Sequence, residues 1–427
     1  MVFDTTTSTS KFNEELKKLY YNNALLLRKD FCKWIDEIGL KNNLDWWISN
    51  PASRNYNHSN LFHVFCLIET LKQAQPILNM SEIIVENQII KDILINQLKI
   101  KLNVKLKKKK YFQIKKNFLL IAKHYLFYSI IFIFSKLGKE KKISNKLNLV
   151  LIDTFLEDSN LSNNRFYSNN FLNIAFKRKN IFFVPSFYLG MGLLQTIKKI
   201  INCKKNNNFL LKESFLGIKD LLKSLFLTFR RKKLNASFSS LKNIDYSSLL
   251  NKELNSNINL SSQILGWQNY LFFKNIKQQN FKIKKSINWF ENQSQDKGWN
   301  LGVRTFFPKA KSYGYQGFTC FPQYMCLSPT QLEYSAKVIP EEILSIGKMF
   351  NNTKKEFCKS LKVKTAPALN FQYLYKKKNK RTKQPNEILL ILSGFLQDDI
   401  NIINWVINSG IYKEVKEIYI KEHPILK

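Results

Sequence analysis

The sequence has few of the residues from which common metal and disulfide sites are built. Six cysteines are scattered through 427 residues, with no CxxC pair among them. This spacing argues against a zinc site or a disulfide framework and favours a reducing compartment. The N-terminal stretch MVFDTTTSTSKFNEELKK also lacks the basic-then-apolar layout of a signal peptide. We therefore expect a cytoplasmic protein.

Several motifs of common enzymes and nucleic-acid-binding modules are missing as well. No P-loop, GxGxxG, GxSxG or HExxH occurs where it would have to act. NTP hydrolysis, Rossmann redox chemistry and zinc proteolysis thus lose their strongest support. The chain also contains no helix-turn-helix, zinc-finger, RNP or KH signature, so nucleic acid is not an expected partner.

Acidic residues are scarce, since 31 Asp and Glu stand against 68 Lys and Arg, a net charge of +37. Such an excess suits a polyanionic substrate, an anionic membrane surface or nucleic acid. The over-use of Lys, Asn, Ile and Phe also has a simpler explanation, because an A/T-rich genome encodes these residues wherever selection is weak. Many of the lysines would then only solvate the surface. For an individual lysine cluster, the solvated surface is the favoured interpretation.

Two stretches have the character of membrane-active helices. Residues 118–137 are almost long enough to span a bilayer, but Lys123 and His124 interrupt them. Residues 214–233 place apolar side chains at helical spacing and end in a basic tail. We expect peripheral attachment to the inner face of the cytoplasmic membrane. A spanning helix at 118–137, or helices that only cover a sheet, are the alternatives.

The order of predicted elements indicates an α/β protein. Short apolar runs such as NLVLIDTF, NIFFVPSF, SINWF and EEILSIGK alternate with helical patterns, as in a buried parallel sheet. We expect two Rossmann-like, doubly wound domains, the second incomplete. The predicted division is an N-terminal acceptor domain at 1–350 with insertions near 100–145 and 204–262, a linker at 351–386, and the start of a donor domain at 387–427.

Candidate site residues follow from this fold, because ligands of open parallel sheets bind outside the carboxyl ends of the strands. Glu291 follows the run INWF and precedes a helix, where it could act as a general base or as a capping carboxylate. Arg54 and Asn55 form a polar cluster after the stretch LDWWIS, which we expect to be a strand. Arg54 would suit an anionic group or a loop ion pair. The other strand-end candidates are Gln293, Gln316, Gly347, Ser393, Gly394, His423 and Pro424.

Three stretches resemble bacterial surface-carbohydrate biosynthesis transferases, which are relatives of capsule and lipopolysaccharide sugar transferases with the two-Rossmann (GT-B) architecture. They are DWWISNPASRN with SNLFHVFC, the block WFENQSQDKGWNLGVRTFFPKAKSYGYQGF, and IYIKEHP. The last resembles the HP motif of sialyltransferase-like and Kdo-transferase-like enzymes. The resemblance covers most of the chain, apart from the Lys- and Asn-rich middle.

The resemblance implies transfer of a sugar from a nucleotide-sugar donor to a glycan or lipid-linked acceptor, with no catalytic metal and no cofactor. It implies Glu291 as base or acceptor ligand and His423 as a ligand of the donor phosphate. With the strand-end argument, we assign Pro424, Ser393, Gly394 and Gly347 to the donor and Arg54, Asn55, Gln293 and Gln316 to the acceptor. The alternatives are a non-catalytic remnant or partner subunit of such an enzyme, and a basic nucleic-acid-binding protein. The sugar, the nucleotide and the acceptor are not specified by the sequence.

Overall fold

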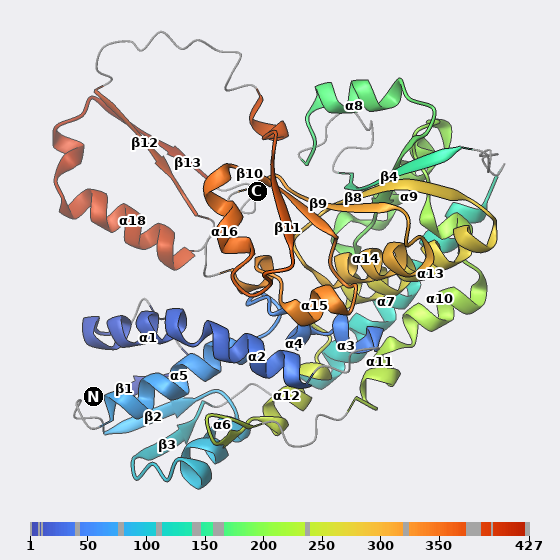
Figure 1. Cartoon of the computed structure of the whole chain (residues 1–427). Coiled ribbons are helices and arrows are strands. Elements are labelled where there is room, and N and C mark those ends of the chain that lie inside the picture. The colour runs from blue at the N-terminus through green and yellow to red at the C-terminus, as the bar shows by residue number, and fades with distance from the viewer. Residues whose placement is uncertain are drawn as a thin grey trace.

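The computed structural model describes most of the chain in eleven stretches and the single residue Thr9. The stretches are 2–6, 12–38, 43–75, 81–107, 113–138, 147–156, 166–234, 240–318, 324–372, 386–393 and 396–422. Figure 1 shows the helices and strands that these residues form.

A six-stranded parallel sheet is the centre of the fold, and its order is β11-β10-β9-β8-β4-β5. Every neighbouring pair in it runs parallel. Most of the residues in β4, β5, β9 and β10 are buried, as expected for a parallel sheet covered by helices, whereas the edge strand β11 has no buried residue. The α/β class predicted from the sequence is thereby confirmed. The strands are β4 (Asn148–Phe155), β5 (Ile181–Ser186), β8 (Lys282–Trp289), β9 (Lys311–Gln316), β10 (Glu342–Ile346) and β11 (Lys362–Ala366).

Helices α13 (Leu260–Gln278) and α14 (Ser294–Phe306) cross in close contact beside this sheet. Two glycines allow the approach, because a Cβ on Gly298 would lie 1.8 Å from the carbonyl oxygen of Gly266. On the other side of α13 lie α7 (Gln113–Lys136) and α10 (Ile218–Leu225). The other helices around this sheet are α8 (Asn169–Phe176), η3 (Leu189–Met191), α9 (Leu193–Lys205), η4 (Lys212–Phe215), α11 (Leu227–Arg231), η5 (Met325–Leu327), α15 (Gln331–Ser335), η6 (Lys348–Phe350), α16 (Asn351–Lys354) and η7 (Leu369–Phe371).

The N-terminal part contains a second, smaller parallel sheet of order β1-β2-β3, and the apolar core around it extends to Phe290, Ile343 and Cys358 of the larger part. The strands before residues 117–138 lie in this small sheet, whereas β4, which follows them, belongs to the six-stranded sheet. The antiparallel hairpin β6-β7 also packs in this part, with Ile244 of β7 in its core. Its elements are β1 (Val2–Asp4), α1 (Glu14–Leu26), α2 (Arg28–Ile38), α3 (Leu44–Trp47), α4 (Asn50–Ser53), α5 (Leu61–Ala74), β2 (Glu82–Val85), α6 (Gln88–Asp92), η2 (Ile93–Gln97), β3 (Asn103–Leu106), β6 (Ser240–Leu241), β7 (Ile244–Asp245) and α12 (Ser247–Leu254).

The C-terminal part is a strand–helix–strand unit. Strands β12 (Glu387–Ile391) and β13 (Glu417–Lys421) pair in parallel with each other and are joined through α18 (Leu396–Asn408) and η8 (Ile411–Lys413). Both strands and the helix were predicted. The GT-B arrangement of two Rossmann-like domains stays a proposal.

Two local predictions were wrong. LDWWIS is not a strand: Leu44–Trp47 form α3, which Asn43 caps, and Ser49 caps α4, with Pro51 in its first turn, where proline is tolerated. The expected linker at 351–386 contains α16 and the edge strand β11. The apolar stretch at 214–233 contains two helices, α10 and α11, divided at Phe226.

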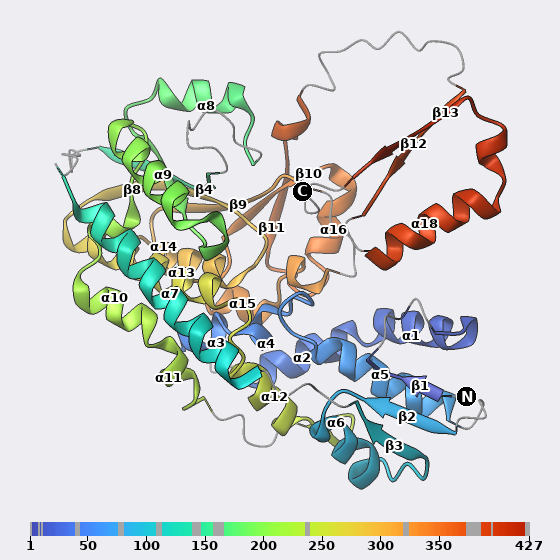
Figure 2. The same ribbon diagram turned by 180° about the vertical axis from the view of Figure 1, so that it is seen from behind.

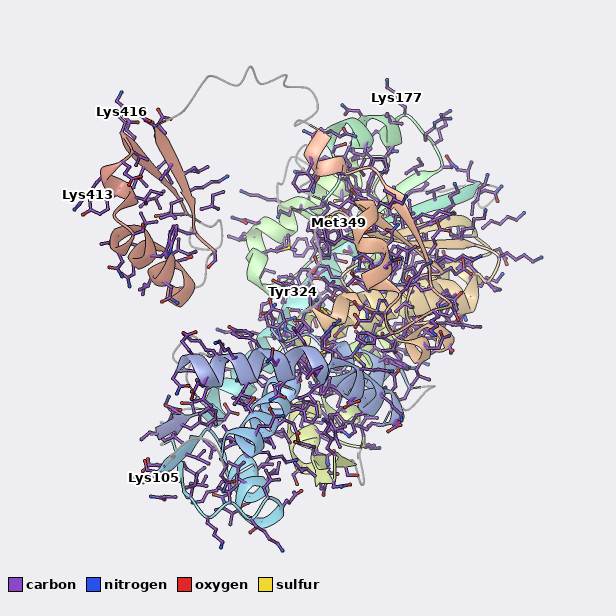
Figure 3. The ribbon with its side chains drawn as sticks, turned by 60° about the vertical axis from the view of Figure 1, so that its left-hand side comes forward. Lys105, Lys177, Tyr324, Met349, Lys413 and Lys416 are labelled. Carbon is purple, nitrogen blue, oxygen red and sulfur yellow. The ribbon has the colours of Figure 1, made fainter. Side chains whose placement is uncertain are left out.

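Basic side chains are spread over the whole surface. Figure 3 shows Lys105 on β3, Lys177 after α8, and Lys413 and Lys416 in the C-terminal unit, projecting from separate parts of the molecule. This distribution agrees with the interpretation that many lysines only solvate the surface.

Candidate functional site at the carboxyl ends of the sheet

The turn between β8 and α14 carries Glu291, Asn292 and Gln293. Asn292 has a positive φ of 56°, a conformation that asparagine adopts more readily than most residues. The backbone N–H groups of Glu291 and Gln293 both donate to Asp296 Oδ2 at 3.0 Å. The carboxylate that holds this turn is therefore Asp296, and these bonds do not involve the side chain of Glu291.

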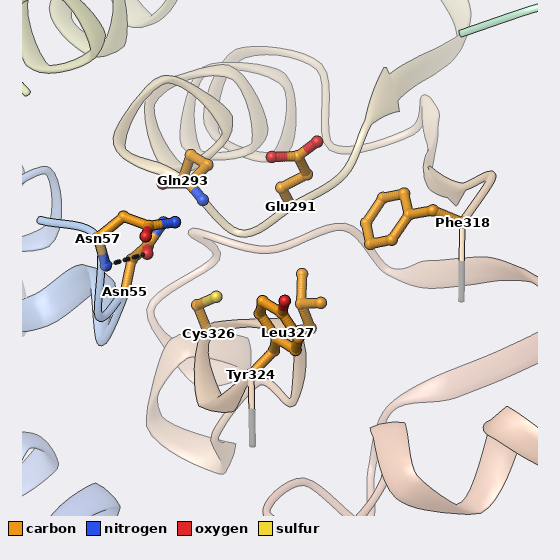
Figure 4. Close-up of a pocket in the computed structure, with 8 residues that line it drawn as sticks. All are labelled: Asn55, Asn57, Glu291, Gln293, Phe318, Tyr324, Cys326 and Leu327. Carbon is orange, nitrogen blue, oxygen red and sulfur yellow. Dashed lines mark hydrogen bonds between the residues drawn. The ribbon is translucent and has the colours of Figure 1, made fainter. Parts of the chain in front are cut away.

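Glu291 and Gln293 form one wall of a pocket with a volume of about 370 Å³. Figure 4 shows Tyr324, Cys326 and Leu327 on the opposite wall, Asn55 and Asn57 at one side and Phe318 at the other. The walls thus come from the turn after β8, the segment after β9 and the loop after α4. Three residues predicted from separate parts of the sequence, Asn55, Glu291 and Gln293, meet here.

Glu291 is half-buried and is oriented by an aromatic neighbour. The indole Nε1–H of Trp289 donates to Glu291 Oε1 at 2.8 Å. In Figure 4 the carboxylate is directed away from Tyr324 and Leu327, toward the side of α14. The hydrogen bond from Trp289 holds the Glu291 carboxylate in place. A carboxylate can take up a proton, which is the chemistry of a general base.

Arg54 does not face this pocket. Its side chain is buried and forms an ion pair with Glu333 in α15, and it also donates to the Ser328 carbonyl oxygen at 3.2 Å. The backbone of Arg54 is left-handed, with φ of 52°, and caps the end of α4. Of the two roles considered for Arg54, the structure shows the ion pair; a guanidinium in this position is unable to meet an acceptor in the pocket.

Glu333 is the centre of a buried network that joins three parts of the pocket. Lys297 in α14 donates to its Oε1 at 2.6 Å, and Asn292 Nδ2 donates to the same oxygen at 3.1 Å. Burial alone would raise the pKa of Glu333, but the charges of Arg54 and Lys297 and their hydrogen bonds lower it to about 2. The network therefore fixes the loop after α4 and α15 against the turn that carries Glu291.

A second buried polar cluster lies at the carboxyl ends of β4 and β5. Lys212 Nζ donates to Ser186 Oγ at 2.7 Å and to Asn269 Oδ1 at 2.8 Å, and Ser186 Oγ donates to Asp153 Oδ1 at 3.4 Å. Burial raises the pKa of Asp153 to about 7, against the opposing charge of Lys212. Asn269 also donates to the Gln295 carbonyl oxygen in α14, which links this cluster to the pocket wall.

The sheet order explains why polar groups gather at this edge. From β4 the chain moves to β5 on one side, whereas β8 adds to the other side of β4 and leads on to β9, β10 and β11. The order of connection therefore reverses between β4 and β8. Such a switch point is where ligands of open parallel sheets bind, and Asp153 and Glu291 lie at or just beyond these two strand ends.

Comparison with protein-family models, with curated proteins and with solved structures returned no match for this chain.

The remaining predicted site residues lie elsewhere or outside the described residues. Gln316 ends β9 and is fully buried, paired in register with Ser345, and it does not line the pocket. Gly347 follows β10 with a positive φ of 82°. Ser393 donates through its backbone N–H and its hydroxyl to Asp399 Oδ1, at 2.6 and 2.8 Å. Gly394, His423 and Pro424 fall outside the described residues.

Sequence reasoning missed five of the eight residues that line the pocket. Asn57, Phe318, Tyr324, Cys326 and Leu327 come from loops, where no periodic pattern marks a residue. The buried acids had visible signals: Asp153 interrupts an apolar strand, and Thr330 and Glu333 have the spacing of a helix capping box. Among the described residues, no three His, Cys, Asp or Glu side chains are grouped as metal ligands.

Proposed function

We propose that this chain is a glycosyltransferase of surface-polysaccharide or lipopolysaccharide biosynthesis that transfers a sugar from a nucleotide-sugar to a glycan or lipid-linked acceptor. One observation carries the proposal. Glu291, Gln293 and Asn55 line a single pocket beside the switch point of a parallel sheet.

The pocket has the chemistry that a hydroxylated acceptor needs. Asn55, Asn57 and Gln293 offer amide donors and acceptors, and Tyr324 and Phe318 offer apolar ring faces. Gln293 Oε1 is buried and has no hydrogen-bond partner among the described residues, so an acceptor hydroxyl could satisfy it. Glu291 would remove the proton from the attacking hydroxyl.

The two-lobed architecture belongs to the same proposal. The unit β12–α18–β13 would begin the donor lobe, in which Ser393, Gly394, His423 and Pro424, together with Gly347 from the first lobe, approach the donor phosphates. The excess of basic over acidic residues suits an anionic nucleotide-sugar. A non-catalytic partner subunit would keep the acceptor pocket but show no turnover.

Glu291→Gln is the decisive variant, because the amide keeps the shape and can still accept from Trp289 but cannot take a proton. The protein is mixed with a panel of UDP-, GDP-, CDP- and ADP-sugars, and release of free nucleotide is followed with and without glycan acceptors. We expect the variant to lose about 10²- to 10⁴-fold in turnover, with thermal unfolding and donor binding unchanged.

Glu15→Gln is the matched control, since Glu15 is an exposed glutamate in α1. It should turn over like the wild type. Equal turnover of wild type and Glu291→Gln would refute the role of Glu291, and a wild type that binds no member of the panel would refute the transferase itself.

A further inference from the structure

One face of the molecule carries apolar side chains that no described element covers. Helix α7 lies between α9 on one side and α10 with α11 on the other, as Figure 2 shows. Leu119, Leu126 and Ile133 are exposed at intervals of seven residues and so lie on one stripe of α7, which the exposed Leu137 continues just past the end of the helix; Phe118, next to Leu119, is exposed as well. We call the outward side of these four helices the α7 face.

The stripe on α7 continues onto its neighbours. On α10 and α11, Ile218, Leu222, Phe226 and Phe229 are exposed at successive helical turns. The ring of Phe226 lies 6.2 Å from that of Tyr125 in α7, and Tyr125 Oη is 2.8 Å from Thr228 Oγ1. On α9, Leu194 and Ile201 are exposed.

The charge on this face is of one sign. The four helices contain a single acid, Asp220, whose carboxylate accepts from the Gly217 N–H and from Asn275 Nδ2. Exposed lysines border the apolar stripe on each helix, namely Lys123, Lys136, Lys198, Lys205, Lys219, Lys223 and Lys232. Apolar side chains with a basic border are complementary to an anionic lipid surface.

The inner side of α7 decides between lying on a bilayer and crossing one. Among the described residues, α7 is the one helix long and apolar enough to cross a membrane by length and composition. Yet Phe127, Tyr128 and Ile131 are buried in the core of the six-stranded sheet, and Tyr128 Oη donates to the Phe187 carbonyl oxygen at 3.2 Å. A spanning α7 would have to leave that core.

We infer that the α7 face docks on an anionic bilayer, with α7 parallel to the surface and its outer stripe inserted among the headgroups. This inference goes beyond the proposed transfer reaction and does not depend on it. It places the molecule where a lipid-linked acceptor would be found, and it uses none of the pocket residues.

The test is flotation of the full chain with vesicles of phosphatidylcholine plus phosphatidylglycerol, and with phosphatidylcholine alone. We expect binding to the anionic vesicles that weakens with salt. The double variant Leu126→Ser/Phe229→Ser should lower the binding at least about tenfold, because it removes two apolar side chains from the stripe. Reversing charge with Lys123→Glu/Lys219→Glu should remove the preference for anionic vesicles.

Leu26→Ser/Met349→Ser is the matched control, because it removes two apolar side chains that are at least as exposed but lie outside the four helices. Leu26 and Met349 are 75% and 80% exposed, against 63% and 57% for Leu126 and Phe229. Thermal unfolding of each variant verifies the fold. Glu291→Gln should float like the wild type, which separates this inference from the proposed function.

Three results would overturn the inference. The first is equal binding of the stripe variant and the control. The second is a wild type that floats with neither vesicle but forms an oligomer that Leu126→Ser/Phe229→Ser disperses, which would make the face a contact between copies. The third is resistance of bound protein to extraction by high salt and alkaline carbonate, which would show a spanning helix.

Discussion

The carboxylate of Glu333 binds two buried cations, Arg54 and Lys297, at once. Removing its charge would leave both cations buried without a counter-ion, so we expect Glu333→Gln to destabilise the fold by about 3–5 kcal/mol. Chemical denaturation measures the change. Glu37→Gln, in the exposed pair with Lys33 at 3.6 Å, is the control and should leave stability unchanged. Equal stability of wild type and Glu333→Gln would show that the network does not hold the pocket walls.

Asp153 makes stability depend on pH. Its pKa is raised by burial from an ordinary value of 3.8 to about 7, so its contribution is fully present below about pH 4 and is lost as the pH rises through about 7. Asp153→Asn cannot ionise. Relative to the wild type, this variant should gain stability as the pH rises from about 4 to about 7, by at most about 1.4 kcal/mol for each pH unit, and the difference should level off above about pH 7.

Thermal unfolding across that pH range checks this prediction. Thr154→Ser is the control, because Thr154 is a buried neighbour that does not titrate, and its difference from the wild type should be the same at every pH. A pH-independent difference for Asp153→Asn would contradict the buried, titrating carboxyl group.

Single residues differ in how far the sequence predicts them, for a physical reason. Glu291, Gln293 and Asn55 were found because a position at the end of an element is a local property. The partner of Arg54 was not, because Glu333 follows it by 279 residues and only the folded chain brings the two together. The raised pKa of Asp153 could not be predicted either, because the segments that bury its side chain are distant in the sequence.

At the scale of elements, buried strands were predicted well and amphipathic pieces less so. The strands β4, β5 and β10 consist mostly of consecutive apolar residues, a pattern that few other structures explain. The two tryptophans of LDWWIS are equally at home in a buried helix, so the tertiary contacts of α3 decide its state. Strand β11 was missed because it is an edge strand with exposed lysines, which resembles a polar linker.

The crossing of α13 and α14 depends on Gly298. A methyl group there would meet the backbone of Gly266, which has no flexible side chain to move aside. We expect Gly298→Ala to cost about 3 kcal/mol of unfolding free energy, measured by denaturant titration. Gly190→Ala is the control, since a Cβ at Gly190 meets nothing within 4 Å. A variant Gly298→Ala as stable as the wild type would mean that the helices separate at little cost.

At the scale of the whole molecule, the described residues form two large apolar cores: one contains residues of β4, β5, β8, β9 and β10, and the other joins the small sheet and its helices to Phe290, Ile343 and Cys358 of the larger part. Residues of 387–421 contribute to neither core, and β12 and β13 pair only with each other among the described strands. By contrast, the segment up to η7 is anchored: Tyr315 Oη donates to the Pro367 carbonyl oxygen at 2.9 Å and accepts from the Leu369 N–H at 3.0 Å. The stability of the larger part should therefore not depend on the C-terminal unit.

A chain ended after Gln372 tests this division. We expect its thermal unfolding to match that of the full chain. The truncation removes no residue of either core, and the segment that leads into η7 keeps its hydrogen bonds to Tyr315 in β9. Under the proposed function the same truncation removes Ser393, Gly394 and His423, so binding of nucleotide-sugars should be lost while the acceptor pocket remains. Circular dichroism melting and donor binding by calorimetry give the two readouts. A marked fall in melting temperature would mean that the C-terminal unit packs against the larger part. Unchanged donor binding would mean that the donor site lies in the first 372 residues, where polar groups remain at the switch point between β4 and β8.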